Sequence, residues 1–175
     1  LQDVVRRQGY PSGGAAAGTV LIGTKVTELS APCTGAVVPL AEIPDPVFAS
    51  GAMGPGLGIE PANGRIVSPV AGEVLVAMDT GHAFGIRTAE GVEVLVHVGV
   101  DTVQMKGEGF SGALAKGSHV KAGQTLVTAD LDAIRAAGHA ATVVLLVTNH
   151  QKFPNVTPIA TDEVLAGEPV LSVTA

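Results

Sequence analysis

The sequence of 175 residues contains no tryptophan, one tyrosine, four phenylalanines and a single cysteine, Cys33. With so few aromatic side chains, the hydrophobic core must be built from valine, leucine, isoleucine and alanine. A lone cysteine excludes an internal disulfide, which is typical of a reducing compartment and predicts a cytoplasmic protein. No run of about 18 uninterrupted apolar residues occurs, so the sequence predicts no segment that inserts into a membrane.

Charged residues are also scarce, at 15% of the chain, and the formal net charge is −6. This acidic balance argues against nucleic acid as a partner and favours docking to a basic protein surface. Hydrophobic residues make up 46% of the chain and stand among 23 glycines and 11 prolines. That composition is typical of short strands joined by many tight turns.

The first 28 residues differ in composition from the remainder. Residues 1–8 are expected to form two turns of helix, and residues 9–18 are rich in glycine and alanine, as in a flexible linker. We therefore expect residues 1–28 to be a tail or linker and residues 29–175 to form one domain. Because the chain starts at Leu1 rather than methionine, we also expect it to belong to a longer chain.

Turn signals along the domain predict an all-β fold. Residues 32–37 and 69–74 share the pattern Pro-x-x-Gly-x-Val, and each leads to a phenylalanine, Phe48 and Phe84. Residues 117–126 predict a hairpin, and residues 131–137 predict a helix capped by Asp130. Together these signals predict an antiparallel β-sandwich or flattened barrel with an internally duplicated motif and one or two short helices.

Two histidines, His82 and His97, lie in short apolar segments separated by a hairpin-type turn at residues 87–91. We expect the two segments to be neighbouring antiparallel strands, so that the imidazoles face each other. An imidazole can act as nucleophile, proton carrier or metal ligand near neutral pH, and a glycine beside each histidine lets another molecule approach. Thr80, two residues before His82, can fix an imidazole tautomer.

Several chemistries remain open for this pair on the residues alone. Both histidines are compatible with a structural role in the core, provided that each imidazole has a hydrogen-bond partner. A zinc hydrolase needs three protein ligands, and the pair supplies two. The glycine-rich residues 51–58 lack the strand and helix that flank a phosphate-binding loop, and Lys106 is not at the bare hairpin tip of a biotinyl or lipoyl carrier.

The same segments resemble the glucose-family enzyme IIA domain of the bacterial phosphoenolpyruvate-dependent sugar phosphotransferase system, over roughly residues 31–173. The strongest similarity lies in the two histidine motifs, at residues 80–84 and 96–103. Further matching segments are residues 31–35, 43–49, 106–110, 130–131 and 164–170. The match departs from the usual pattern at Gly81 and Val98, where the best-known members carry asparagine and phenylalanine.

The resemblance implies that His97 accepts a phosphoryl group from a small histidine-containing phosphocarrier protein. His97 would then pass this group to a cysteine on the IIB domain of a sugar transporter. It implies that His82, oriented by Thr80, donates a hydrogen bond to a phosphoryl oxygen, and that no cofactor or metal is required. The domain would work in the cytoplasm, alone or tethered to the inner face of the membrane through a fused or associated transporter.

The resemblance also implies an exposed apolar patch for partner docking. The patch residues are Phe48, Ala52, Met53, Met78, Leu95 and Val103. Asp45 and Asp101 would lie at its rim and meet an arginine of the phosphocarrier. Leu95 and Met78 stand where relatives carry aromatic residues.

An alternative is a regulatory binding module of the same fold, which docks and inhibits other proteins through this patch. It would share a zinc ion between His82, His97 and a partner ligand.

Overall fold

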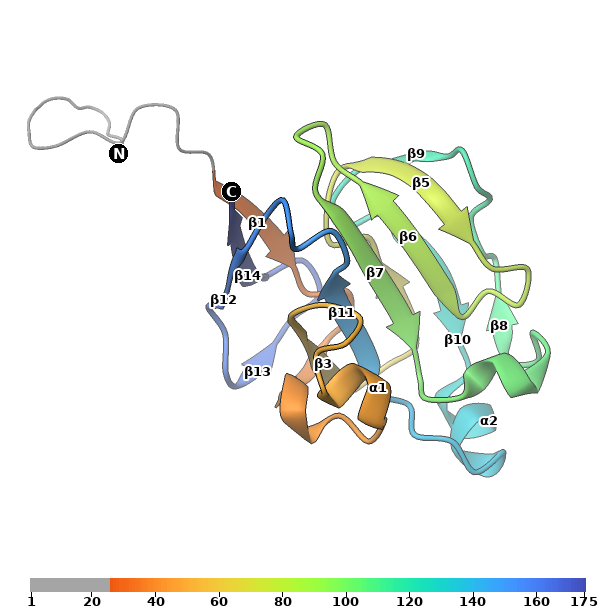
Figure 1. Cartoon of the computed structure of the whole chain (residues 1–175). Coiled ribbons are helices and arrows are strands. Elements are labelled where there is room, and N and C mark those ends of the chain that lie inside the picture. Colours follow the sequence, from red (N-terminus) through yellow and green to blue (C-terminus); the bar gives the residue numbers. More distant parts are fainter. Residues whose placement is uncertain (1–25) are drawn as a thin grey trace, which may run out of the picture.

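The computed structural model describes residues 26–175, which form fourteen strands and two short α-helices (Figure 1). The strands are β1 (Val26–Ser30), β2 (Gly35–Pro39), β3 (Gly56–Pro61), β4 (Arg65–Val67), β5 (Gly72–Ala77), β6 (Ala83–Arg87), β7 (Glu93–Val98), β8 (Phe110–Ser111), β9 (His119–Val120), β10 (Thr125–Ala129), β11 (Val143–Val147), β12 (Asn155–Pro158), β13 (Glu163–Val164) and β14 (Pro169–Thr174). The helices are α1 (Pro46–Ala49) and α2 (Leu131–Ala136), with 3-10 helices η1 (Leu40–Glu42) and η2 (Thr102–Met105). The expected helix and linker lie outside the described residues, so the domain boundary stays a prediction.

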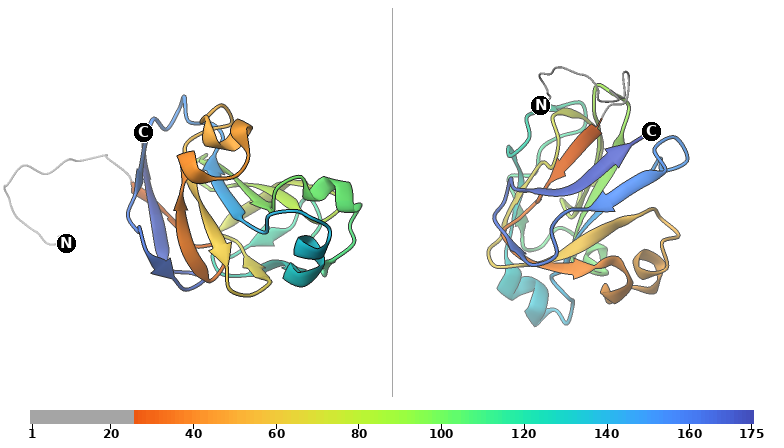
Figure 2. Two further views of the ribbon diagram at one scale, coloured as in Figure 1. Left: turned by 90° about the horizontal axis from the view of Figure 1, so that it is seen from below. Right: turned by 90° about the vertical axis from the view of Figure 1, so that its left-hand side faces the viewer.

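The strands form one large sheet and two small ones, and neighbouring strands within residues 26–175 pair in the antiparallel sense. The eight-stranded sheet has the order β13-β2-β3-β11-β7-β6-β5-β9, and the small sheets are β1-β14-β12 and β4-β10-β8. Both views in Figure 2 show β1 and β14 side by side, as their pairing requires. The antiparallel sandwich predicted from the sequence is confirmed, and these strands do not close into a barrel.

The predicted duplication is visible in the sheet order. One half contains β1, β2 and β3 with β12, β13 and β14, and the other contains β4, β5 and β6 with β8, β9 and β10. Reciprocal hydrogen bonds join equivalent positions of the halves. The Ser30 amide donates to the Pro69 carbonyl at 2.9 Å, and the Val67 amide donates to the Pro32 carbonyl at 2.7 Å. Strands β7 and β11 pair at the centre of the large sheet and join the two halves.

The glycine of each Pro-x-x-Gly motif is required by close strand packing. A Cβ on Gly35 would lie 2.0 Å from the carbonyl oxygen of Glu60, and one on Gly72 would lie 2.2 Å from that of Arg87. Only glycine permits these approaches. The repeated motif therefore marks the same structural position in both halves.

Two details of the predicted organisation are wrong. Phe84 lies in β6 and pairs with Val96, whereas the matching position in β3 is Leu57, which pairs with Leu145. Phe48 lies instead in α1, which is inserted between β2 and β3.

The predicted hairpin at residues 117–126 is also absent, because β9 pairs with β5 and β10 pairs with β4 and β8. The local turn is present, but its two strands join different sheets.

The core consists mainly of valine, leucine, isoleucine and alanine, as the composition predicts. All five residues of β11 are buried, because one face of this central strand packs into the main core and the other packs under α1. Burial raises the pKa of the Cys33 thiol to about 12, so this cysteine behaves as a small apolar core residue. Helix α2 begins at Leu131, and Asp130 caps it by accepting from the Ala133 amide, as predicted. Neither helix of residues 26–175 has the length and apolar character needed to cross a membrane.

Candidate functional site

His82 and His97 meet at one end of the β6–β7 pair. His97 lies in β7 opposite Ala83, and His82 immediately precedes β6. The Val98 amide donates to the His82 carbonyl at 2.7 Å, which continues the strand pairing past the end of β6. The two imidazole centroids are 5.1 Å apart, and the ring planes cross at 81°. The structure therefore brings the two histidines together as the turn at residues 87–91 predicts.

Hydrogen bonds orient both rings through their Nδ1 atoms. Nδ1 of His97 lies 2.7 Å from the Gly99 carbonyl oxygen. A carbonyl only accepts, so Nδ1 carries the proton and Nε2 of His97 keeps its lone pair. Thr80 Oγ1 lies 2.5 Å from Nδ1 of His82. When this hydroxyl donates, the proton of His82 is on Nε2, which is then a hydrogen-bond donor.

The glycines near the histidines are needed for left-handed backbone conformations. They do not expose the chain to a partner, so that expectation is wrong. Gly81 and Gly99 are buried and have φ of +74° and +79°. Their amides donate to the carbonyls of Met78 and Thr142 and are therefore unavailable to a ligand. A Cβ on Gly99 would lie 2.4 Å from Thr102 Cγ2, so only glycine fits this turn after His97.

Two aromatic rings line the histidine pair. Phe48 packs edge-on against His97, with centroids 5.1 Å apart and an interplanar angle of 61°. Phe110 lies 6.5 Å from the ring centroid of His82. The side chain of Phe48 is 6% exposed and packs on Val144 and Leu146 of β11. The expectation that Phe48 is exposed is therefore wrong, since this ring forms a wall of the site, and its role in docking stays a prediction.

The remaining patch residues are accessible. Ala52, Met53, Met78 and Val103 are exposed, and Leu95 is half-buried on β7. Sequence reasoning missed two exposed valines, Val47 in α1 and Val76 in β5. Strand alternation could have identified Val76, because Val76 pairs with Gly85 and Gly85 pairs with Leu95 on the same face.

The two predicted rim carboxylates, Asp45 and Asp101, act electrostatically on His97 and raise its pKa. Asp45 caps α1, with its carboxylate accepting from the Val47 amide at 2.9 Å. Asp101 is exposed and adopts a left-handed conformation with φ of +59°. The site therefore combines a neutral histidine pair with two nearby negative charges.

Burial keeps both histidines neutral. Burial is the larger cause and the electrostatic effect of His97 the smaller one, and together they lower the pKa of His82 to about 4. Burial also lowers the pKa of His97, while the hydrogen bond to Gly99 and the two aspartates oppose that change. Near pH 7 each imidazole is therefore uncharged, and His97 Nε2 is free to act as a nucleophile.

The lowered pKa of His82 makes stability depend on pH. Between pH 6.5 and about pH 4 the unfolded chain binds a proton at this histidine and the folded protein does not, so stability falls as pH falls. We expect this to contribute on the order of 1 kcal/mol between pH 7 and pH 5. Urea unfolding should show a smaller loss for His82→Gln than for wild type, with the exposed His119→Gln as control. Equal losses in all three proteins would contradict this assignment.

Metal binding by the pair is incomplete within the chain. No group of three or more histidine, cysteine, aspartate or glutamate side chains among residues 26–175 is placed to hold a metal ion. The Nδ1 atoms of both rings are engaged, so a metal could bind only at Nε2, and on His82 that atom would first have to lose its proton. A zinc ion here would need its other ligands from a partner.

Comparison with known proteins places these observations in a family. Residues 27–153 match the family described as phosphoenolpyruvate-dependent sugar phosphotransferase system, EIIA 1. The chain is 45% identical over 130 residues to the glucose-specific EIIA component of Bacillus cereus, covering 73% of this chain and 79% of that protein. It is 42% identical over 147 residues to the beta-glucoside-specific EIIBCA component of Halalkalibacterium halodurans, covering 84% of this chain and 23% of that protein.

Comparison with solved structures supports the same family. Glucose permease IIA from Mycoplasma capricolum has a TM-score of 0.76 and 32% sequence identity, over 87% of this chain and 99% of that one. The chain spans 16–23% of the length of its multi-component relatives, in which EIIA is joined to EIIB and EIIC. The resemblance stated from the two histidine motifs is thus confirmed, and this chain belongs to the EIIA 1 family of the phosphoenolpyruvate-dependent sugar phosphotransferase system.

Proposed function

We propose that this chain is a phosphoryl carrier whose acceptor atom is Nε2 of His97. The observation that carries the proposal is the 2.7 Å contact between His97 Nδ1 and the Gly99 carbonyl, which leaves the Nε2 lone pair free. A new N–P bond forms at His97 as the N–P bond of a phosphohistidine on the phosphocarrier protein breaks. The new N–P bond at His97 then breaks as an S–P bond forms on a cysteine of a IIB domain.

The surroundings of His97 suit this transfer. Phosphoryl transfer between two nucleophiles requires mainly an in-line position for the acceptor and stabilisation of the spread negative charge. His82, with Thr80 donating to its Nδ1, presents Nε2–H to a phosphoryl oxygen. Because the pKa of His82 is low, its ring is uncharged before transfer. It therefore forms no ion pair with the acceptor. The transfer needs no metal or cofactor.

Docking of both partners would use the exposed apolar residues beside the site. Met53, Met78 and Val103 are exposed, and Asp45 and Asp101 add negative charge near His97. An arginine of the phosphocarrier would meet these carboxylates, and such charge complementarity speeds encounter. Several relatives join EIIA to EIIB in one chain, which supports a IIB domain as the second partner on the cytoplasmic side.

A charge in the apolar patch should slow transfer. We expect Met78→Asp to reduce the rate of phosphoryl acceptance at limiting phosphocarrier about tenfold, because a carboxylate would be desolvated on docking. The control is Leu165→Asp, since Leu165 is an exposed apolar residue in the turn between β13 and β14. Rapid-quench measurement of acceptance compares the three proteins. Equal rates for Met78→Asp and wild type would exclude Met78 from the docking surface.

The proposal is tested by intact-mass analysis after incubation with phosphoenolpyruvate, enzyme I and the phosphocarrier protein. The expected result is one acid-labile phosphoryl group per chain. No added mass, while another acceptor is phosphorylated in the same mixture, would overturn the proposal.

A regulatory binding role is the second candidate, and the exposed apolar side chains of Met53 and Met78 favour it. The module would dock on other proteins and inhibit them, with a zinc ion shared between His82, His97 and a partner ligand. A phosphoryl group on His97 would add charge at the centre of this surface and prevent docking. A pure binding module predicts no phosphoryl labelling, so the mass measurement separates the two functions.

A further inference from the structure

A second set of hydrogen bonds lies behind His97 and leads away from the site. The Gly99 carbonyl that accepts from His97 Nδ1 belongs to the same peptide group as the Val100 amide, which donates to the Ala140 carbonyl at 2.9 Å. The preceding amide, of Gly99, donates to the Thr142 carbonyl, also at 2.9 Å. Both peptide groups flanking Gly99 are therefore held by residues 140–142.

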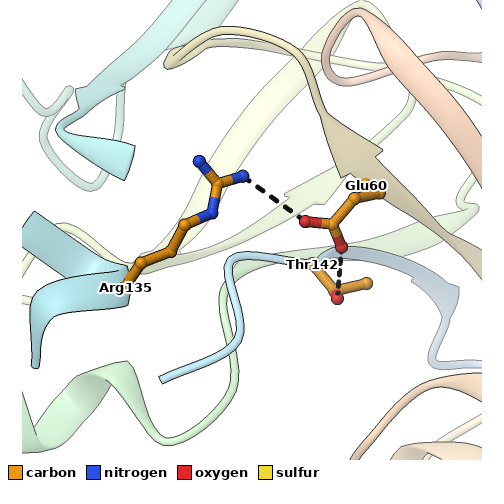
Figure 3. A network of polar contacts seen from close by, with 3 residues as sticks. All are labelled: Glu60, Arg135 and Thr142. Carbon is orange, nitrogen blue, oxygen red and sulfur yellow. Dashed lines mark hydrogen bonds and ion pairs between the residues drawn. The ribbon is translucent and has the colours of Figure 1, made fainter. Parts of the chain in front are cut away.

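The side chain of Thr142 ties this segment to a charged pair. Thr142 is 3% exposed, and its Oγ1 donates to Oε1 of Glu60 at 3.0 Å (Figure 3). The other carboxylate oxygen of Glu60 lies 3.5 Å from Nη2 of Arg135. Glu60 is in β3, Arg135 is in α2, and Thr142 precedes β11. The network therefore joins three elements at the segment that holds the Gly99 turn.

An ion pair in the other half of the duplicated fold offers a comparison with this network. Arg87 and Glu73 form a pair at 3.6 Å in the other half, between β6 and β5. The side chains of the two pairs are similarly exposed, 47% and 40% against 47% and 48%. Exposed pairs of this kind contribute little to stability. Of the two carboxylates in these pairs, Glu60 also accepts from the buried Thr142 hydroxyl, which lies beside the Gly99 turn.

We propose that Glu60, Thr142 and Arg135 are positioning residues for His97. Arg135 restrains the Glu60 carboxylate, which restrains Thr142 through a charge-assisted hydrogen bond. Residues 140–142 then hold the Gly99 peptide, whose carbonyl sets the orientation and tautomer of the His97 ring. The chain of bonds from Ala140 through the 99–100 peptide to the imidazole also polarises cooperatively. This inference rests on the proposed role of His97 as the acceptor.

The test compares wild type with Thr142→Val, Thr142→Ser, Glu60→Gln and the control Arg87→Gln. Thr142→Val removes the hydroxyl without changing charge, so it separates positioning from a direct effect of the Glu60 charge. Two measurements are made on each protein: the rapid-quench rate of phosphoryl acceptance, and the NMR signals of the His97 imidazole. The second measurement needs no phosphorylation, so it decides the inference even if the proposed function fails.

We expect Thr142→Val and Glu60→Gln to slow acceptance about 3-fold to 30-fold and to speed exchange of the His97 Nδ1 proton. The His97 titration should move to lower pH, because the Gly99 hydrogen bond raises its pKa. Thr142→Ser should restore the wild-type acceptance rate and the wild-type signals of the His97 imidazole. Arg87→Gln should match wild type in both measurements. Unchanged imidazole signals in Thr142→Val, or an equal change in Arg87→Gln, would overturn the inference.

Discussion

The His97→Gln variant is expected to gain no phosphoryl group under conditions in which the wild-type chain is labelled completely. Glutamine has a similar length and can still donate a hydrogen bond toward the Gly99 carbonyl, but its amide nitrogen has no available lone pair. The rate of acceptance should therefore fall at least about 1,000-fold, below detection, because the nucleophile itself is lost. Intact-mass analysis over a time course measures the change.

The fold of this variant should be intact, which makes the loss interpretable. His97 is neutral and half-buried, so a neutral replacement leaves no unpaired charge in the site. Circular dichroism and the urea midpoint should be close to those of wild type. Full labelling of His97→Gln, combined with loss of labelling in a His82 variant, would assign the acceptor to His82 and reverse the proposed roles.

Local sequence signals predicted the centre of the site well. The turn at residues 87–91 joins two short strands with strong β-propensity, so the pairing that brings His82 to His97 depends on few distant contacts. The Asp130 cap is similarly local, since its carboxylate bonds an amide three residues later. Features of this kind are decided by short stretches of sequence, and tertiary structure did not override them.

Features that depend on distant pairing were not predicted correctly. The turn near Gly123 is real, yet β9 and β10 leave it toward β5 and β4, which no pattern within residues 117–126 can specify. The comparison of Phe48 with Phe84 failed because α1 is inserted into only one half of the repeat. Insertion also buries Phe48 on β11, so an apolar residue expected at the surface became a wall of the site.

The network behind His97 was invisible in the sequence for the same reason. Glu60 lies 82 positions from Thr142 and 75 positions from Arg135, and none of the three stands in a recognisable motif. Their proximity depends on the pairing of β3 with β11 and on the place of α2 after β10. Only the three-dimensional structure connects such residues to the orientation of an imidazole.

The His82→Ala variant should keep the acceptor but slow the reaction. His82 is buried against His97, and its Nε2 is the ring nitrogen left free by Thr80. Removing a hydrogen-bond donor aimed at the transferring group costs about 100-fold to 1,000-fold in rate, because charge on the phosphoryl oxygens loses its partner. Unlike His97→Gln, this variant should still accumulate a phosphoryl group during a long incubation. Rapid-quench rates of acceptance and of transfer to a IIB domain measure the effect.

Thr80→Val provides the graded comparison, because it leaves the imidazole in place and removes only the hydroxyl that orients it. Its rate should fall by about 10-fold, between wild type and His82→Ala, because the ring then samples the tautomer that cannot donate from Nε2. If His82→Ala accepted and transferred phosphoryl groups at the wild-type rate, His82 would be a structural neighbour of the acceptor. If Thr80→Val were slower than His82→Ala, orientation of His82 would not explain the role of Thr80, and the hydroxyl would have to act on the phosphoryl group itself.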